Sequence, residues 1–106
     1  MEIPFQMYFA IDDVERTYFI ERLGSQKKIM IKTATKNSND VYIKVDTKNY
    51  TIVGCDSKYN PTGTLYNDKI ISGAFFGLVP GRNDLSVVVN NKPGPANKLE
   101  YDYKYI

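Results

Sequence analysis

The sequence predicts an all-β protein, built as an antiparallel two-sheet β-sandwich of the jelly-roll kind. Apolar and polar residues alternate along several stretches, turn-forming residues separate these stretches at short intervals, and no long run has helical periodicity. Counting the alternating runs gives about eight or nine short strands. The 106 residues, 42% of them hydrophobic, fit a single domain, residues 1–106, with its own core.

The first half of the chain contains five predicted strands. Residues 3–11 carry only apolar side chains on one face, namely Ile3, Phe5, Met7, Phe9 and Ile11. Residues 17–23 fit a strand or two helical turns closed by Gly24, and we prefer the strand. Two more alternating runs follow, 27–35 and 41–45, the second with Val41, Ile43 and Val45 inward. The spacer 47–49 then predicts a tight hairpin with a strand at 50–53, because Asn49 tolerates a left-handed backbone.

The second half begins with residues 55–63, whose turn-rich composition predicts a long surface loop. Short strands are expected at 65–71, 74–79 and 84–90, and Val87-Val88-Val89 predicts that the core is centred on the last of them. The proline-containing stretch 90–98 predicts an exposed hairpin loop. The closing strand 99–105 places four residues on one face: Leu99, Tyr101, Tyr103 and Tyr105. We expect this face to close the core, with an adhesive stripe as the alternative.

The sequence offers few side chains that could catalyse a reaction or bind a metal. It has no histidine, which excludes a Ser-His-Asp triad and a histidine zinc site. Cys55 is the only cysteine, so no internal disulfide can form, and we expect it to be packed and inert. Asp56-Ser57-Lys58 lacks the glycine and the glutamate of a calcium loop. We therefore expect no catalytic residue, no metal and no cofactor, and an enzyme relying on carboxylates and lysines is the least favoured alternative.

Charge and aromatic content indicate which partners to expect. The net charge is +2, from 14 basic and 12 acidic side chains that are dispersed, so a nucleic-acid partner is not expected. No apolar run is long enough to cross a bilayer and no export signal is visible, so we expect no membrane partner and synthesis in the cytoplasm. Nine tyrosines and five phenylalanines indicate a binding surface for proteins or sugars. Tyr59 and Tyr66, beside the long loop, are the candidate contacts.

Residues 79–83 read Val-Pro-Gly-Arg-Asn, and they predict a structural turn made by Pro80, Gly81 and Asn83. Proline followed by glycine suits a type II turn, in which the glycine supplies a positive φ.

The segment around this turn, 72–85, resembles a signature of siphophage distal tail proteins: an aromatic residue, leucine, proline, glycine, any residue, asparagine. The runs 41–47 and 99–105 resemble two further strands of the C-terminal domain of that family. The resemblance implies a galectin-like β-sandwich and a component of the hexameric ring that joins the tail tube to the baseplate or tip. Nothing here resembles the family's N-terminal ring-forming domain. An isolated module, a fragment and a separate small tail protein therefore all stay open.

The function we expect is that of a phage tail or baseplate structural module. It would attach to other tail proteins, or to copies of itself, in the virion tail, after synthesis in the cytoplasm of the host bacterium. The alternative is a carbohydrate-binding module that recognises host cell-wall polysaccharide through exposed tyrosines, namely Tyr59 and Tyr66. Galactoside binding in the galectin manner is not expected, because the chain lacks the histidine and tryptophan that galectins use.

Overall fold

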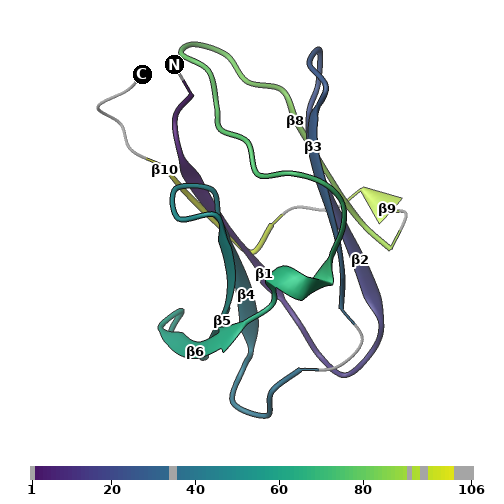
Figure 1. Cartoon of the computed structure of the whole chain (residues 1–106), viewed down its shortest axis with the longest axis vertical. Coiled ribbons are helices and arrows are strands. Elements are labelled where there is room, and N and C mark those ends of the chain that lie inside the picture. The colour runs from purple at the N-terminus through teal and green to yellow at the C-terminus, as the bar shows by residue number, and fades with distance from the viewer. Residues whose placement is uncertain (1, 34–35, 91, 94–95, 102–106) are drawn as a thin grey trace.

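The computed structural model describes residues 2–33, 36–90, 92–93 and 96–101. Within these residues, two five-stranded antiparallel sheets pack against each other as a β-sandwich (Figure 1). The first sheet has the strand order β10-β1-β4-β5-β6 and the second has the order β7-β3-β2-β8-β9. The predicted fold class is therefore confirmed.

The strands of the first sheet are β1 Phe5–Ala10, β4 Tyr42–Asp46, β5 Thr51–Cys55, β6 Pro61–Leu65 and β10 Lys98–Tyr101. The strands of the second are β2 Arg16–Arg22, β3 Lys27–Thr33, β7 Ile70–Gly73, β8 Leu85–Val89 and β9 Lys92–Pro93. A 3-10 helix, Asn67–Lys69, leads from β6 on one sheet to β7 on the other.

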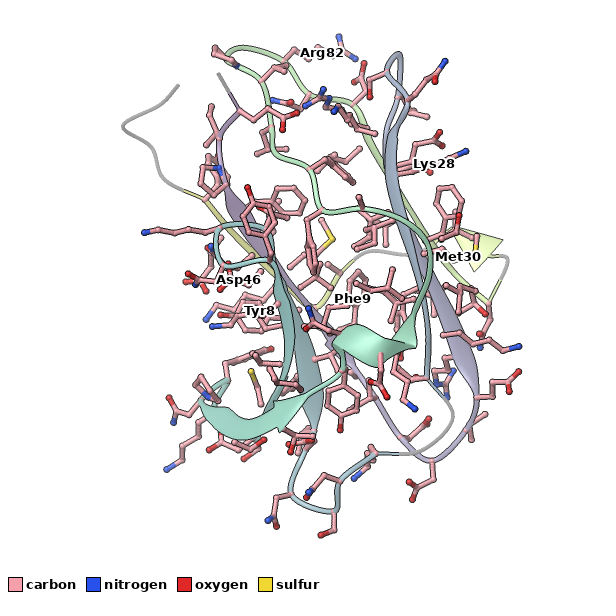
Figure 2. The ribbon with its side chains drawn as sticks, in the orientation of Figure 1. Tyr8, Phe9, Lys28, Met30, Asp46 and Arg82 are labelled. Atoms are coloured by element: carbon pink, nitrogen blue, oxygen red, sulfur yellow. The ribbon has the colours of Figure 1, made fainter. Side chains whose placement is uncertain are left out.

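The core lies between the two sheets and is built mainly by four strands, β1, β4, β2 and β3. The predicted inner face of residues 3–11 is confirmed, since all five apolar residues are buried. Figure 2 shows Phe9 between the sheets, whereas Tyr8 and Asp46 lie on the outer side of the first sheet. The prediction that the core is centred on Val87-Val88-Val89 is wrong, because β8 is only partly buried along its whole length. Val88 pairs with Phe19 on the outer face of the second sheet.

Several predicted elements of the first half are confirmed with local corrections. Residues 16–22 form a strand and not a helix. The hairpin between β4 and β5 is present, but its left-handed residue is Tyr50, at φ 55°, and not Asn49. Val41 is exposed, contrary to the predicted inward position. It lies in a bend just before β4, and its N–H donates to the carbonyl of Cys55.

The second half departs further from prediction. The expected long loop is shorter, because β6 begins at Pro61 and pairs with β5 through an irregular register. Proline is tolerated there since β6 is an edge strand and Pro61 is its first residue. The expected strand 65–71 divides into the 3-10 helix and β7. In 74–79, the ladder is reduced to a single bridge from Leu78 to Ile3.

The end of the chain is described only in part. Within the expected loop 90–98, residues Lys92 and Pro93 form the short strand β9 against β8. β10 confirms the start of the closing strand, with Tyr101 packed against the core, although Leu99 is exposed at the sheet edge. Tyr103 and Tyr105 lie outside the described residues.

The turn at 79–83 is closed by a side chain. Gly81 has φ 90°, in the left-handed region that the Pro80-Gly81 pair was predicted to supply. The side-chain oxygen of Asn83 accepts from the N–H of Val79 at 2.8 Å, and its amide nitrogen donates to the carbonyl of Val79 at 2.9 Å. The same nitrogen donates to the carbonyl of Gly81 at 3.2 Å. Asn83 therefore replaces backbone pairing across the bend, which accounts for an asparagine at this place.

Candidate functional site

The outer face of the first sheet is covered by a tyrosine cluster, which we define as Tyr8, Tyr42 and Tyr59. Tyr8 points away from the core, yet only 5% of its surface is exposed. Its ring meets that of Tyr59 edge-on, with centroids 5.2 Å apart, and Tyr59 stacks on Tyr42 at 4.4 Å. Both arrangements are among those that aromatic pairs prefer.

A tight loop positions Tyr59 over the sheet. The carboxylate of Asp56 accepts from the N–H groups of Lys58 and Asn60, at 2.9 and 3.0 Å. This local bonding is the ordinary use of aspartate in turns. It holds Tyr59 in a left-handed conformation, at φ 66°, from which its ring lies on Tyr42.

Two charged side chains of β10 contact the tyrosine cluster on the outer face of the first sheet. The Nζ atom of Lys98 lies 4.6 Å from the ring centroid of Tyr59 and 5.2 Å from that of Tyr8, within cation–π range. The hydroxyl of Tyr8 donates to Glu100 at 2.8 Å. Burial, together with this bond to a carboxylate, strongly raises the pKa of Tyr8. The raised pKa keeps the phenol of Tyr8 neutral, and Lys98 places a cation of the chain itself against the rings of Tyr8 and Tyr59.

The two tyrosines proposed as contacts lie in different surroundings. Tyr59 is half-buried, and its ring is already engaged by Tyr42, Tyr8 and Lys98. The prediction that Tyr66 is an exposed contact is wrong, because only 3% of its surface is exposed. The structure does not bring these two side chains into one surface.

Tyr66 instead belongs to a buried polar cluster with Asp40. The Tyr66 hydroxyl donates to one carboxylate oxygen of Asp40 at 2.5 Å, and the hydroxyl of Thr62 donates to the other. Asp40 has no exposed surface. Burial, followed by the bond to Asp40, raises the pKa of Tyr66 to about 12. The cluster ties the segment before β4 to β6, so its role is structural.

The outer face of the second sheet is different, because it carries an apolar row. We define the apolar row as Met30, Phe19 and Val88, which the strand registers place side by side across β3, β2 and β8. All three side chains are partly exposed. Figure 2 shows Met30 on the outer side of β3, away from the core.

Polar side chains flank the apolar row on both sides. Along β2, Glu21 pairs in register with Lys28 of β3 and Ser86 of β8. On the other side, Thr17 lies opposite Lys32, which forms an ion pair with Glu15 at 3.3 Å. An apolar centre with a polar rim is the general layout of a protein interface.

Groups for other chemistry are sparse in the described part of the chain. No three Asp, Glu, Cys or His side chains gather there as metal ligands would. Cys55 is fully buried, and burial raises the pKa of its thiol, which disfavours the reactive thiolate. No helix among the described residues is long and apolar enough to cross a membrane. Comparisons with protein-family models, with curated proteins and with solved structures find no match for this chain.

Sequence reasoning missed the three residues of the apolar row. The signal was present in part, since the alternation that buries Tyr18 and Ile20 necessarily turns Phe19 outward. A single outward phenylalanine indicates an apolar surface only when its neighbours on the adjacent strands are known to be apolar as well. Those neighbours, Met30 and Val88, are set by pairings that no local pattern encodes.

Proposed function

We propose that this chain is a non-catalytic attachment module of a phage tail or baseplate, which binds neighbouring tail proteins through the apolar row. It would act in the virion tail, after synthesis in the cytoplasm of the host bacterium. The single observation that supports this best is the apolar row itself. One face of an antiparallel sheet can be solvated, and such a face is normally polar.

The contrast between the two outer faces supports this choice of surface. The first sheet covers its outer face with the tyrosine cluster and Lys98, so its aromatic surface is largely satisfied within the chain. The second sheet leaves Phe19 and Met30 partly exposed to solvent. Apolar side chains that remain accessible on one face mark interaction sites more often than isolated ones do.

The phage assignment is supported by the resemblance of residues 72–85 to the distal tail protein signature. In this chain the asparagine and glycine of that signature act in the bend at 79–83, where Asn83 bonds Val79 and Gly81. The bend leads directly into β8, which carries Val88 of the apolar row. The partner we propose is a neighbouring tail or baseplate protein with a matching apolar surface, and a second copy of this chain is the alternative occupant.

A matched pair of variants tests the proposal. Val88→Glu places a charge in the apolar row, and Val53→Glu places the same charge on the outer face of the first sheet, where Val53 pairs with Lys44 and Leu65. Both valines are half-buried strand residues. Tail proteins encoded beside this chain should be retained by the tagged wild type and by Val53→Glu, and lost with Val88→Glu. Equal retention by both variants, or no retention by the wild type, would count against the proposal.

A further inference from the structure

The β4–β5 turn presents one aromatic ring to solvent. Tyr50 is 67% exposed, which is the largest exposure among the large hydrophobic side chains of the described residues. Its backbone has φ 55°, a left-handed conformation that is unusual for a bulky residue. Glycine or asparagine would adopt it at lower cost.

The surrounding structure holds Tyr50 in this conformation. The side chain of Asn67 donates to the carbonyl of Tyr50 at 2.9 Å and accepts from the N–H of Ile52 at 2.8 Å. At the start of the turn, the carboxylate of Asp46 accepts from the N–H of Lys48 at 3.0 Å. Uncommon backbone conformations that are held in place by the surrounding structure are concentrated at functional sites.

A small open cavity of about 150 Å³ lies beside the ring. Tyr50 meets Phe75 edge-on, with ring centroids 5.9 Å apart, so two aromatic rings form one wall. The other walls come from segments far apart in sequence: Glu2, Pro4, Thr47, Lys48, Phe76 and Gly77. Figure 1 shows the β4–β5 turn beside the chain segment that leads into β1.

Hydrogen bonds hold the carboxylate of Glu2 in place at the cavity. One oxygen of Glu2 accepts from Arg22 at 3.1 Å, and the other accepts from the N–H of Gly77 at 3.3 Å. Lys48 extends from the same turn as Tyr50 and is exposed. Glu2 and Lys48 therefore both line the cavity beside the aromatic wall.

We propose that this cavity is a subsite for one uncharged pyranose residue of a polysaccharide. A ligand here must offer an apolar face to Tyr50 and hydrogen-bonding groups to Glu2 and Lys48 at the same time. A pyranose does so, because its C–H groups form a flat face and its hydroxyls lie around the rim. The cavity is smaller than the roughly 300–1,000 Å³ usual for enclosed small-molecule sites, which suits one residue of a chain lying across an open surface.

Two measurements on the full chain test this subsite. The first is an array of neutral and acidic glycans. The second is an NMR titration of the ¹⁵N-labelled chain with maltohexaose, cellohexaose and N-acetylchitohexaose, with polygalacturonate as the acidic comparison. At least one neutral glycan should bind and shift the amide signals of Tyr50, Lys48 and Gly77. Binding only to acidic glycans, or to none, overturns the proposal.

Variants at Tyr50 separate ligand binding from folding. Tyr50→Gly should weaken glycan binding at least tenfold and raise the urea midpoint of unfolding, because glycine relieves the left-handed backbone. Tyr50→Phe should retain binding, since the ring face makes the contact. Leu65→Ala, which removes an exposed apolar side chain outside the cavity, is the control and should leave affinity unchanged. Undiminished binding by Tyr50→Gly, or loss of binding by Tyr50→Phe, overturns the proposal.

Discussion

Replacing Gly54 by alanine is predicted to be costly because of the buried carboxylate of Asp40 beside it. A Cβ atom built on Gly54 would lie 2.3 Å and 2.5 Å from the two carboxylate oxygens of Asp40 and 2.4 Å from its Cγ. Asp40 cannot move outward, because it has no exposed surface and its oxygens accept from Tyr66 and Thr62. Gly54→Ala must therefore displace either the carboxylate or the backbone of β5.

The cost follows from these contacts. Hydrogen bonds to a charged group contribute roughly 1.5–3 kcal/mol each, and overpacking a close-packed site costs about 1–3 kcal/mol. If the substitution sacrifices one such bond and part of the packing, the free energy of unfolding should fall by about 3–5 kcal/mol. This is a large share of the roughly 5–15 kcal/mol that stabilises a typical domain.

Urea unfolding of a double-mutant cycle provides the assay. Gly54→Ala is measured in the wild type and in an Asp40→Ala background, where the obstructing carboxylate is gone. The substitution should cost about 3 kcal/mol or more in the first case and under about 1 kcal/mol in the second. Equal costs in the two backgrounds would refute the reasoning, since the effect would then not arise from Asp40.

Three further predictions concern stability. Because the pKa of Tyr66 rises from 10.0 to about 12 on folding, the folded chain retains this proton longer than the unfolded chain does. The contribution of Tyr66 to the free energy of unfolding is complete below about pH 10 and is lost as the pH rises towards 12. Tyr66→Phe should therefore make the urea midpoint fall less steeply with pH in that range. An unchanged slope of urea midpoint against pH would contradict this. Gly81→Ala should cost about 1 kcal/mol from φ alone, because a Cβ there meets nothing within 4 Å, and unchanged stability in thermal unfolding would contradict the turn assignment. Tyr50→Gly should stabilise the chain by about 1 kcal/mol in urea unfolding, and a loss would show that the Tyr50 ring supports the fold.

Local patterns were sufficient to predict the strands that alternate cleanly. Ile3 to Ile11 bury every second side chain, so period-two alternation identified both the strand and its inner face. The Pro80-Gly81 pair likewise indicated a bend, because only a few residue types accept the backbone angles involved. In these segments the local preference and the tertiary structure agree.

Prediction failed where tertiary contacts decide the outcome. Pro61 and Gly63 suggested a loop, yet they lie in edge strand β6, whose irregular register accommodates them. Tyr66 was expected to be exposed because it lies near the predicted long loop, but the buried carboxylate of Asp40, 26 positions away, accepts a hydrogen bond from its hydroxyl. Val87-Val88-Val89 appeared to be buried on both sides, whereas only one face of β8 meets the core.

The candidate sites show the same limit. Whether an outward side chain is covered depends on the loops above it: Tyr8 is covered by Tyr59, while Phe19 remains partly exposed. The cavity beside Tyr50 joins Glu2, Lys48 and Phe75, which lie in separate segments of the sequence. No composition or spacing argument could have brought these residues together.

The central claim is that the chain holds tail proteins through the apolar row, and light scattering tests it most directly. The mass of the purified chain would be measured alone and mixed with the tail proteins encoded beside it, for the wild type, Val88→Glu and Val53→Glu. The proposal predicts a stable mixed complex for the wild type and Val53→Glu and its loss with Val88→Glu. A wild-type chain that remains a monomer in every mixture would contradict it.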